Sequence, residues 1–557
     1  MRSYVVCGMQ FGDEGKGSFV DYLANKSNAN WIVRYNGGAN ASHTVITPNG
    51  KIHRFCQLGA GMFNDNTKVY MSRNMVLNID KLILEINRFN ITMLKDDRNI
   101  YSRIFISPFC YLVTPYHVLI SKLRELNSGI NRRGVGCTGV SEVRYLEYIS
   151  RNEKGSCYKK YGHLGIQIFD IDFSLTQEAN KKLRKEESDK EISLEDFING
   201  LEKKILALKK YAICFYEEHK DKINKNIPDF MKENLNAEIA RLFAEKAETE
   251  LAKSLMSKFE SFINMCKSFV RKSICGKVTD DGLQEVFPCE DEILKYNDVM
   301  AKYSFAIEEY LRKYTIIYEG AQGLLLDGKY GIRPNVTQLD TTTNYALKYI
   351  GEINKSLLDS GVKFDNVVAK IGIAKAFYTK HGKGTFPTES FELKKFMCEE
   401  MQDDSYWNGN VRYGWFDAVL LRYAQRINKV GQLFLSSIDK LDGLDKVYVC
   451  NSYEYVGPVD KHFESLFDYY RDDSLNYIIT NIKHSSNRLG EYLKRCKPIY
   501  VKVPGWNRSI VNDMQGRLSL SGDCKNYVRL ISSLIGIPVT MVSFGPSREQ
   551  RFFVHLK

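Results

Sequence analysis

Short apolar runs recur along the chain, and most of them are followed by a glycine-containing turn and then by a helical pattern. The runs stand at residues 4–9, 31–38, 103–107, 314–320, 366–373, 432–439, 446–450 and 538–545. Helical patterns such as residues 79–89 and 526–536 alternate with them. This alternation predicts an α/β fold with a large, mostly parallel central sheet covered by helices. Ligand chemistry is then expected at the carboxyl ends of the strands.

The pattern changes between residues 172 and 312, where the sequence becomes rich in Lys and Glu and apolar residues recur at three- and four-residue spacing. That spacing is typical of amphipathic helices. We therefore expect an α/β catalytic domain made of residues 1–171 and 313–557, interrupted by a helical insertion at 172–312. Acidic residues interspersed among the lysines favour a solvated helical face over a nucleic-acid-binding arm.

Composition excludes some classes of protein but does not identify a single one. With 557 residues, of which 44% are hydrophobic, the chain can bury a large core. A net charge of +12 fits an anionic small-molecule substrate as well as it fits nucleic acid. The thirteen cysteines contain no C-x-x-C pair, which predicts free thiols rather than a zinc site or disulfides. Since no signal peptide or membrane-spanning apolar run is seen, we expect a cytoplasmic protein.

The first candidate for chemistry is the glycine-rich stretch F-G-D-E-G-K-G-S, which separates the first apolar run from a helical pattern. Its spacing differs from that of the common P-loop motif, and Gly17 replaces the hydroxyl residue of that motif. Gly12, Gly15 and Gly17 still allow a phosphate to approach the backbone, and Lys16 adds a positive charge. Asp13 would repel a bare phosphate, so we expect it to hold magnesium or to act as a base.

Further polar loops follow other predicted strands. They carry Asn40, His43 and Thr44, then Glu319 and Gln322, and then Asp439. A single histidine is more often structural, but the position of His43 after two glycines and beside a hydroxyl favours a function. The amide of Gln322 can donate to and accept from a base edge. Asp439 could accept two N–H groups of guanine, and the last turn, 542–549, is suited to closing over that base.

In this order the motifs resemble the adenylosuccinate synthetase family. The matching segments are residues 12–17, 34–44, 115–117, 136–139, 319–327, 334–337, 384–389, 414–417, 439–444, 504–506 and 543–548. They run from end to end and leave out only the enlarged helical region. The resemblance implies a P-loop-like GTP-binding ligase fold and a homodimer.

The resemblance also implies a reaction, in which IMP, L-aspartate and GTP give adenylosuccinate, GDP and phosphate through a 6-phosphoryl purine, in AMP biosynthesis. The implied catalytic residues are Asp13, Lys16, His43 and Gln322. The implied GTP-binding residues are Gly12, Glu14, Gly15, Lys16, Gly17, Ser18, Ser42, His43, Thr44, Asp439, Ser543 and Gly545. The implied IMP-binding residues are Asp13, Asn40, Thr138, Gln322 and Thr337. Magnesium would be held by Asp13 and by the backbone carbonyl of Ser42.

The sequence departs from the family where the amino-acid substrate should bind. Of the arginine cluster in the family's T-T-G-R-x-R-R loop, only Arg412 remains, within Y-W-N-G-N-V-R-Y. Each lost guanidinium removes charge-assisted hydrogen bonds of about 1.5 to 3 kcal/mol. Arg412 and Arg333 are the candidates for binding the substrate carboxylate. Arg144 and Arg151 are candidates for the arginine that reaches the partner's IMP.

Three hypotheses follow from this pattern of kept and altered motifs. The first is the standard ligase. The second is a variant ligase that uses another purine nucleotide or another amine donor, because the acceptor loop is altered while the phosphate loops are kept. The third is a non-catalytic nucleotide-binding protein that reuses the fold.

Overall fold

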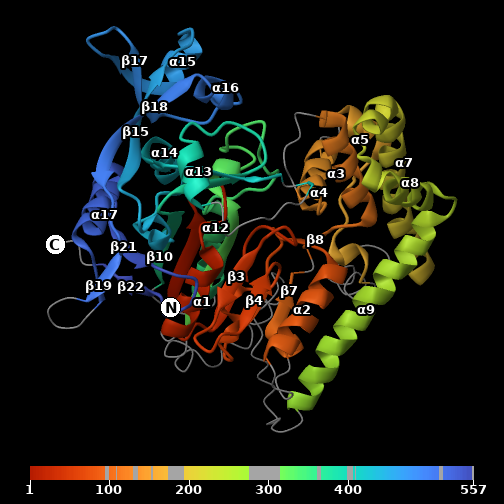
Figure 1. Ribbon diagram of the computed structural model, residues 1–557. Coiled ribbons are helices and arrows are strands. Elements are labelled where there is room, and N and C mark those ends of the chain that lie inside the picture. The colour runs from red at the N-terminus through yellow and green to blue at the C-terminus, as the bar shows by residue number, and fades with distance from the viewer. Residues whose placement is uncertain are drawn as a thin grey trace.

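The structure, a computed structural model, describes residues 1–93, 100–107, 109–129, 136–151, 155–172, 193–274, 314–359, 366–397, 406–407, 409–512 and 518–554. A nine-stranded sheet forms its centre, with the order β22-β21-β14-β10-β1-β9-β2-β5-β7 (Figure 1). All neighbouring strands pair in parallel except β21 and β22. The large, mostly parallel sheet that the sequence predicts is confirmed.

The strands of this sheet are β1 (Arg2–Gly8), β2 (Trp31–Arg34), β5 (Lys68–Met71), β7 (Ile104–Ile106), β9 (Thr315–Gly323), β10 (Val367–Lys375), β14 (Gln432–Ser436), β21 (Val539–Ser543) and β22 (Arg551–Phe553). The helices around it include α1 (Lys16–Lys26), α2 (Ile79–Met93), α12 (Asn344–Asp359), α14 (Ala418–Asn428) and α17 (Gly522–Ile535).

Both faces of the sheet are buried, because successive residues of one strand belong to different cores. Val6 and Ile317 lie in the core that includes residues of α1 and α2. Their neighbours Val5 and Tyr318 lie in a second core with Tyr349 of α12. Side chains alternate between the two faces of a strand, so this division shows helices packed on both sides.

One of the quoted apolar runs, residues 446–450, lies outside the main sheet. It belongs to a second sheet made of β13 (Phe416–Asp417), β15 (Lys446–Tyr455), β16 (Phe467–Arg471), β17 (Tyr477–Ile482) and β18 (Cys496–Pro504). There β15 pairs antiparallel with both β17 and β18. Its residues are buried and partly exposed in turn, which is the pattern of an antiparallel strand with one solvated face. The expectation of a main-sheet strand at this run is therefore wrong.

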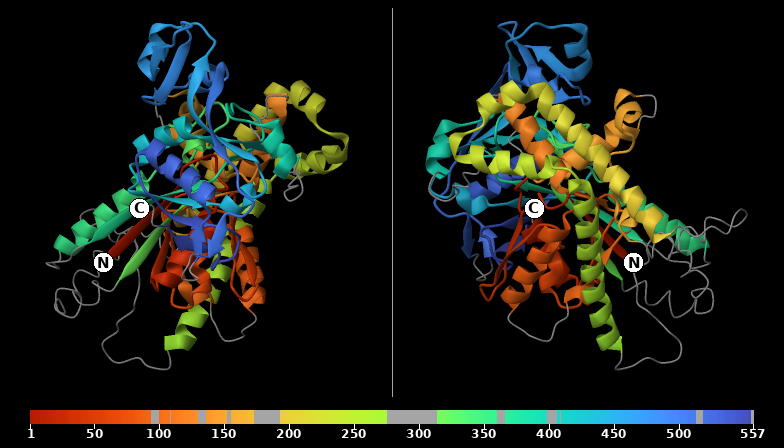
Figure 2. Two further views of the ribbon diagram at one scale, coloured as in Figure 1. Left: turned by 60° about the vertical axis from the view of Figure 1, so that its left-hand side comes forward. Right: turned by 90° about the vertical axis from the view of Figure 1, so that its right-hand side faces the viewer.

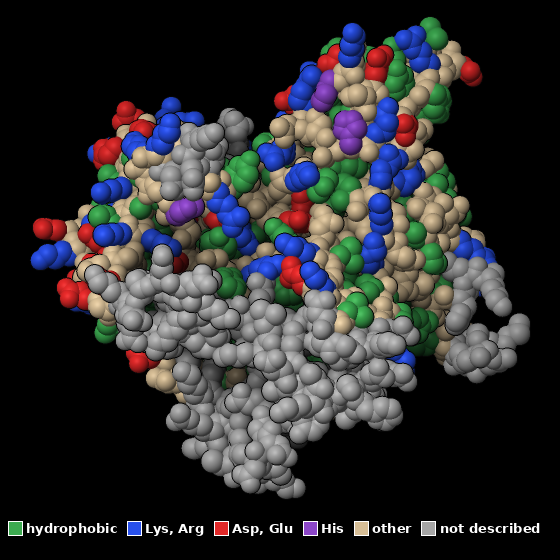
Figure 3. Space-filling model, turned by 180° about the vertical axis from the view of Figure 1, so that it is seen from behind, with side chains coloured by type: hydrophobic (Ala, Val, Ile, Leu, Met, Phe, Trp, Pro, Cys, Tyr) green, Lys and Arg blue, Asp and Glu red, His purple; other side chains and the backbone are tan. Residues whose placement is uncertain are grey.

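Where the structure describes the Lys- and Glu-rich region, it contains three long helices, α7 (Leu194–Asn226), α8 (Asp229–Phe243) and α9 (Ala247–Ile274). α7 packs on α3 (Pro115–Ser128), and α9 runs back beside α2 (Figure 2). On the face seen in Figure 3, acidic side chains lie among the lysines and arginines. Residues 173–192 and 275–313 lie outside the described residues, so the domain boundaries at 172 and 312 stay a prediction.

No helix in the described ranges is long and apolar enough to cross a membrane. Nine cysteines of the described part of the chain are free thiols, and six of these nine are buried.

Candidate active site

The glycine-rich loop between β1 and α1 is folded around the buried carboxylate of Glu14. Its Oε1 accepts the backbone N–H groups of Gln10 at 3.0 Å and Gly12 at 2.9 Å, and its Oε2 binds the ammonium of Lys16. Gly15 adopts a left-handed conformation, with φ of 85°, as the N-cap of α1. Glu14 therefore points inward and closes the loop. The N–H groups at the start of α1 are left for an anion.

Asp13 points the other way, and its side chain is 45% exposed. Its Oδ2 accepts a hydrogen bond from Nε2 of His381, at 2.8 Å, at the end of β11 (Tyr378–His381). Burial raises the pKa of Asp13, but the His381 hydrogen bond and the charge of Lys375 outweigh it and hold the pKa well below its usual range. Asp13 is thus ionised at neutral pH, which suits a metal ligand and a proton acceptor.

The second loop meets the first at Gly17. A Cβ atom placed on Gly17 would lie 2.4 Å from the Cβ of His43, so the approach of the two loops requires glycine there. His43 is buried, and its Nδ1 lies 2.5 Å from Oε1 of Glu319. Burial lowers the pKa of His43, and the Glu319 carboxylate opposes this shift only in part. With Nδ1 held by Glu319, the other ring nitrogen is the one left to act on a ligand.

Glu319 lies within β9 and not in the loop that follows it, which corrects the sequence prediction. The strand continues to Gly323 because that residue pairs again with Gly8 after a bulge. The position inside the strand buries Glu319 completely, and its Oε2 also accepts the N–H of Ala60 at 2.9 Å. Glu319 therefore acts by orienting His43 rather than by facing a ligand.

The loop after β2 packs against the end of β9. Oδ1 of Asn36 accepts the N–H of Ala321 at 2.7 Å, and a Cβ on Gly37 would lie 2.4 Å from the Cβ of Ala321. Next to this contact, both polar atoms of the Gln322 amide and Oδ1 of Asn40 are buried without a partner in the part of the chain that the structure describes. Buried polar atoms are nearly always hydrogen-bonded, so these two amides are suited to bind a ligand.

The two threonines of the implied IMP set come from neighbouring segments. Oγ1 of Thr337 lies 2.9 Å from Oγ of Ser141, which stands in the first turn of α4 (Val140–Arg151). Thr138 lies two residues before the start of that helix and is half-buried. The structure thus brings both threonines to one side of the site.

The loops implied to bind the guanine base reach the glycine-rich loop. At the end of β14, Ser436 donates from its hydroxyl to a backbone carbonyl of that loop at 2.8 Å. The N–H of Ser437 donates to Oγ of Ser543 at 3.2 Å. Asp439 follows in the short 3-10 helix η6 (Ile438–Leu441). Asp439 and the turn at 543–545 are therefore joined to the loop that would hold the phosphates.

Three remaining residues of the implied phosphate set have different surroundings. Ser42 and Thr44 are exposed on either side of His43. The hydroxyl of Ser18 accepts a hydrogen bond from Arg551 at 2.6 Å. This last contact fastens the final strand of the sheet to α1.

Both candidates for the amino-acid carboxylate already donate hydrogen bonds to groups of the protein itself. Arg412, in β12 (Val411–Gly414), pairs with the carboxylate of Glu389 through Nε and Nη2 and donates from Nη1 to the carbonyls of Gly382 and Gly384. Arg333 donates to the carbonyl of Gly328. Arg412 therefore has most of its donors engaged within the protein, although it lines an open hollow of about 770 Å³.

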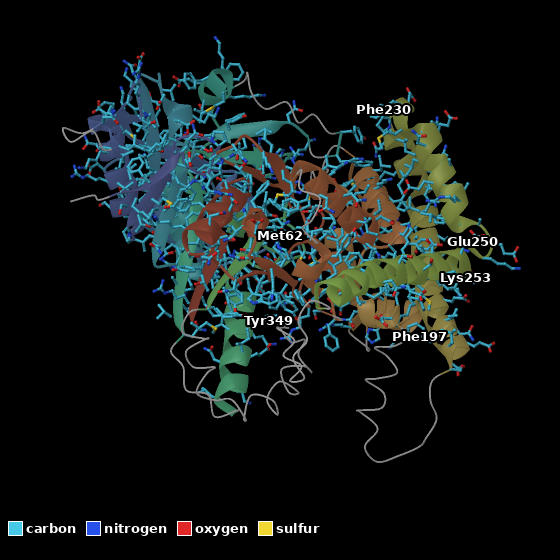
Figure 4. All side chains as sticks on the ribbon, turned by 90° about the horizontal axis from the view of Figure 1, so that it is seen from below. Met62, Phe197, Phe230, Glu250, Lys253 and Tyr349 are labelled. Carbon is cyan, nitrogen blue, oxygen red and sulfur yellow. The ribbon has the colours of Figure 1, made fainter. Side chains whose placement is uncertain are left out.

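The altered acceptor loop contacts the helical region. The ring of Tyr406 lies 5.7 Å from that of Phe230 in α8, centre to centre, and its hydroxyl donates to the carbonyl of Asn226 at 3.5 Å (Phe230 is labelled in Figure 4). Sequence reasoning missed this contact and the partner of Asp13. The only available signal for His381 was its place three residues before the matched segment 384–389.

An α/β sheet whose strand-end loops join a glycine-rich helix start, an ionised carboxylate and unpartnered amides defines a nucleotide-dependent enzyme. The family model for adenylosuccinate synthetase matches residues 5–251 and 236–552. The chain belongs to the adenylosuccinate synthetase family, and is therefore a GTP-dependent ligase of purine biosynthesis that forms a C–N bond.

Individual relatives agree with the family match. The adenylosuccinate synthetase of Streptococcus sanguinis (strain SK36) is 27% identical over 99% of this chain and 97% of its own length. That of Blochmanniella floridana is 28% identical over 100% and 98%. A solved structure of fully ligated adenylosuccinate synthetase from Plasmodium falciparum covers 99% of both chains, with a TM-score of 0.62 and 19% identity, and it supports the fold alone.

Proposed function

We propose that this protein joins IMP and L-aspartate with the hydrolysis of GTP, giving adenylosuccinate, GDP and phosphate. One observation carries the proposal: the ionised Asp13, the Glu319-held His43 and the unpartnered amide of Gln322 lie in segments that contact one another at the carboxyl ends of β1, β2 and β9. Activating a purine oxygen by phosphorylation needs a base, a group that stabilises charge on the phosphoryl, and a contact that reads the purine. These three side chains supply one each.

In the proposed mechanism, the glycine-rich loop and the start of α1 bind the GTP phosphates. Asp13 accepts the proton from N1 of the purine, so that oxygen 6 attacks the γ-phosphorus and GDP leaves. His43 stabilises the charge on the transferring phosphoryl group through the ring nitrogen that Glu319 does not hold. The amino group of aspartate then displaces phosphate from carbon 6. Catalysis rests on positioning and electrostatics.

The residues present fit magnesium, which family members typically use. The Asp13 carboxylate and the Ser42 carbonyl are oxygen donors, and magnesium is commonly held by one or two carboxylates together with substrate phosphates. Among the described residues there is no cluster of three or more His, Cys, Asp or Glu side chains that could hold a metal, which agrees with a site completed by nucleotide oxygens. When bound, magnesium neutralises phosphate charge.

A second candidate is a ligase of the same type that uses another amine donor or another purine nucleotide. The observation that favours it is the pairing of Arg412 with Glu389, since a guanidinium engaged in this way has little capacity left for a substrate carboxylate. In the standard reaction, binding of aspartate would have to displace Glu389 or use other donors.

One experiment separates the two candidates. Purified protein is incubated with GTP, magnesium, and a panel of purine monophosphates and amino acids, and the products are identified by mass. Adenylosuccinate from IMP and aspartate, lost in Asp13→Ala, supports the standard reaction. A product from another pair, with none from aspartate, supports the variant. Absence of any nucleotide product contradicts both.

We also infer that the chain acts as a homodimer with residues 172–312 forming a helical insertion on the catalytic domain. The support is the family resemblance, which implies a dimer in which an arginine of each subunit reaches the IMP of the partner; Arg144 and Arg151 are the candidates in this chain. Light scattering on the full chain measures the mass, and a monomer at micromolar concentration would contradict the inference.

A further inference from the structure

The segment that ends at His381 is fixed against the glycine-rich loop before it reaches Asp13. Gln10 donates from its amide to the carbonyls of Lys375 at 3.2 Å and Phe377 at 3.3 Å, and accepts the N–H of Lys375 at 3.1 Å. The ring of Phe11 packs on that of Tyr378, with centres 6.2 Å apart. The backbone leading into β11 is therefore held to the same loop that presents Asp13.

His381 meets Asp13 in a geometry that a neutral imidazole can satisfy. Nε2 lies 2.8 Å from Oδ2 of Asp13, whereas Nδ1 is buried without a partner among the described residues. A ring with its proton on Nε2 donates to the carboxylate and leaves only a lone pair unsatisfied, which costs less than an orphaned N–H. The contact does not depend on a charged histidine.

Asp13 has few other restraints on its side chain. It stands in the left-handed region, with φ of 57°, and its carboxylate is 45% exposed. Within the described chain, His381 is the only donor of a hydrogen bond to that carboxylate. Without it the carboxylate would be free to rotate, and a base must be held in hydrogen-bonding geometry to its proton to act efficiently.

We propose that His381 is a positioning residue for Asp13: it holds Oδ2 so that Oδ1 faces the purine. The inference rests on the proposed role of Asp13 as the base. His381 is also paired with Val411, at the start of the strand that follows the altered acceptor loop. One antiparallel strand pair, β11 and β12, thus carries both the support of the base and the residues on the amine-donor side of the site.

The test follows phosphoryl transfer without any amine donor. GTP labelled with ¹⁸O in its β,γ-bridge is incubated with magnesium, IMP and enzyme, and reversible transfer moves the label to non-bridging positions. His381→Val removes the donor, and His381→Gln keeps an amide N–H near the place of Nε2. Loss of one hydrogen bond to a charged group predicts a rate about 10- to 100-fold lower for the valine variant. The KM for GTP should stay within about threefold, because the phosphate-binding loop is unchanged.

The glutamine variant should recover at least a third of the wild-type rate, and His484→Val, at an exposed histidine far along the chain, should scramble label like the wild type. A valine variant that scrambles label within threefold of the wild type overturns the proposal. So does a glutamine variant as slow as the valine variant while circular dichroism shows both folded. If the wild type itself fails to scramble label with IMP, the proposed function fails, and the role of His381 fails with it.

Discussion

Asp417 caps α14 with a carboxylate that is completely buried. Its Oδ1 accepts the N–H of Leu420 at 3.0 Å, and its Oδ2 accepts the hydroxyl of Tyr453 at 2.6 Å. Burial raises the pKa of Asp417 from 3.8 to about 6, against the opposing effect of these two hydrogen bonds. The ionised carboxylate therefore destabilises the folded state at neutral pH.

The size of this effect follows from the shift in pKa. One unit corresponds to about 1.4 kcal/mol, so the rise to about 6 amounts to about 3 kcal/mol of stability. Because the folded state has the higher pKa, this stability is fully present below pH 3.8 and is lost as the pH rises through about 6. Asp417→Asn cannot ionise and keeps the oxygen that caps the helix. Its stability relative to the wild type should be about 2 kcal/mol greater at pH 7.5 than at pH 4.5.

Urea unfolding at the two pH values, followed by tryptophan and tyrosine fluorescence, measures this difference. Asp460→Asn is a matched control, since Asp460 caps α15 (Lys461–Leu466) by accepting the N–H of Phe463 at 2.7 Å but is partly exposed. That hydrogen bond lowers the pKa of Asp460, so its contribution is present at neutral pH and lost as the pH falls. The control should therefore lose stability mainly at pH 7.5. An Asp417→Asn variant that follows the same trend would refute the reasoning.

Three further predictions concern the site. In Glu319→Gln the side chain keeps one acceptor oxygen and cannot accept from both His43 and the N–H of Ala60. Turnover in steady-state kinetics should fall at least tenfold, and the free energy of unfolding in urea should fall by about 3 kcal/mol. Unchanged values would show that His43 does not need the carboxylate. Gly17→Ala should displace His43 and lower turnover, whereas Gly351→Ala, in open space on α12, should leave turnover unchanged and raise the melting temperature. Phe230→Ala removes the ring that packs on Tyr406 of the acceptor loop, so it should raise the KM for the amine donor and leave the KM for GTP unchanged. A raised KM for GTP with an unchanged KM for the amine donor would show that the helical region does not support the acceptor loop.

Most of the central sheet could be predicted because its strands are buried on both faces and read as continuous apolar runs. The run at 446–450 shows the same apolar pattern as the main-sheet strands. It belongs to another sheet because it pairs antiparallel with β18, a strand that is distant in the sequence. The short strand β5 was missed because its four residues include a lysine and give too short a signal. Register and partners, which decide such cases, are not local properties.

The candidate site, like the sheet, could be predicted from the sequence only in part. The motifs predict which loops carry chemistry, and the structure joins them through Gly17, Ser436 and Ser543. The pairing of Asp13 with His381 spans 368 positions along the chain and belongs to no motif. The pairing of Arg412 with Glu389 likewise belongs to a part of the fold in which β12 pairs antiparallel with β11, about thirty residues earlier in the chain.

By itself the sequence determined that two acidic residues stand in a glycine-rich turn between a strand and a helix, because glycine spacing and apolar pattern are local features. Only the tertiary structure decided which of them holds the loop together and which stays partly exposed. Glu14 is enclosed by backbone donors and Lys16, whereas Asp13 projects toward β11 and is reached by His381. The direction of each carboxylate is set by partners that only the folded chain brings together.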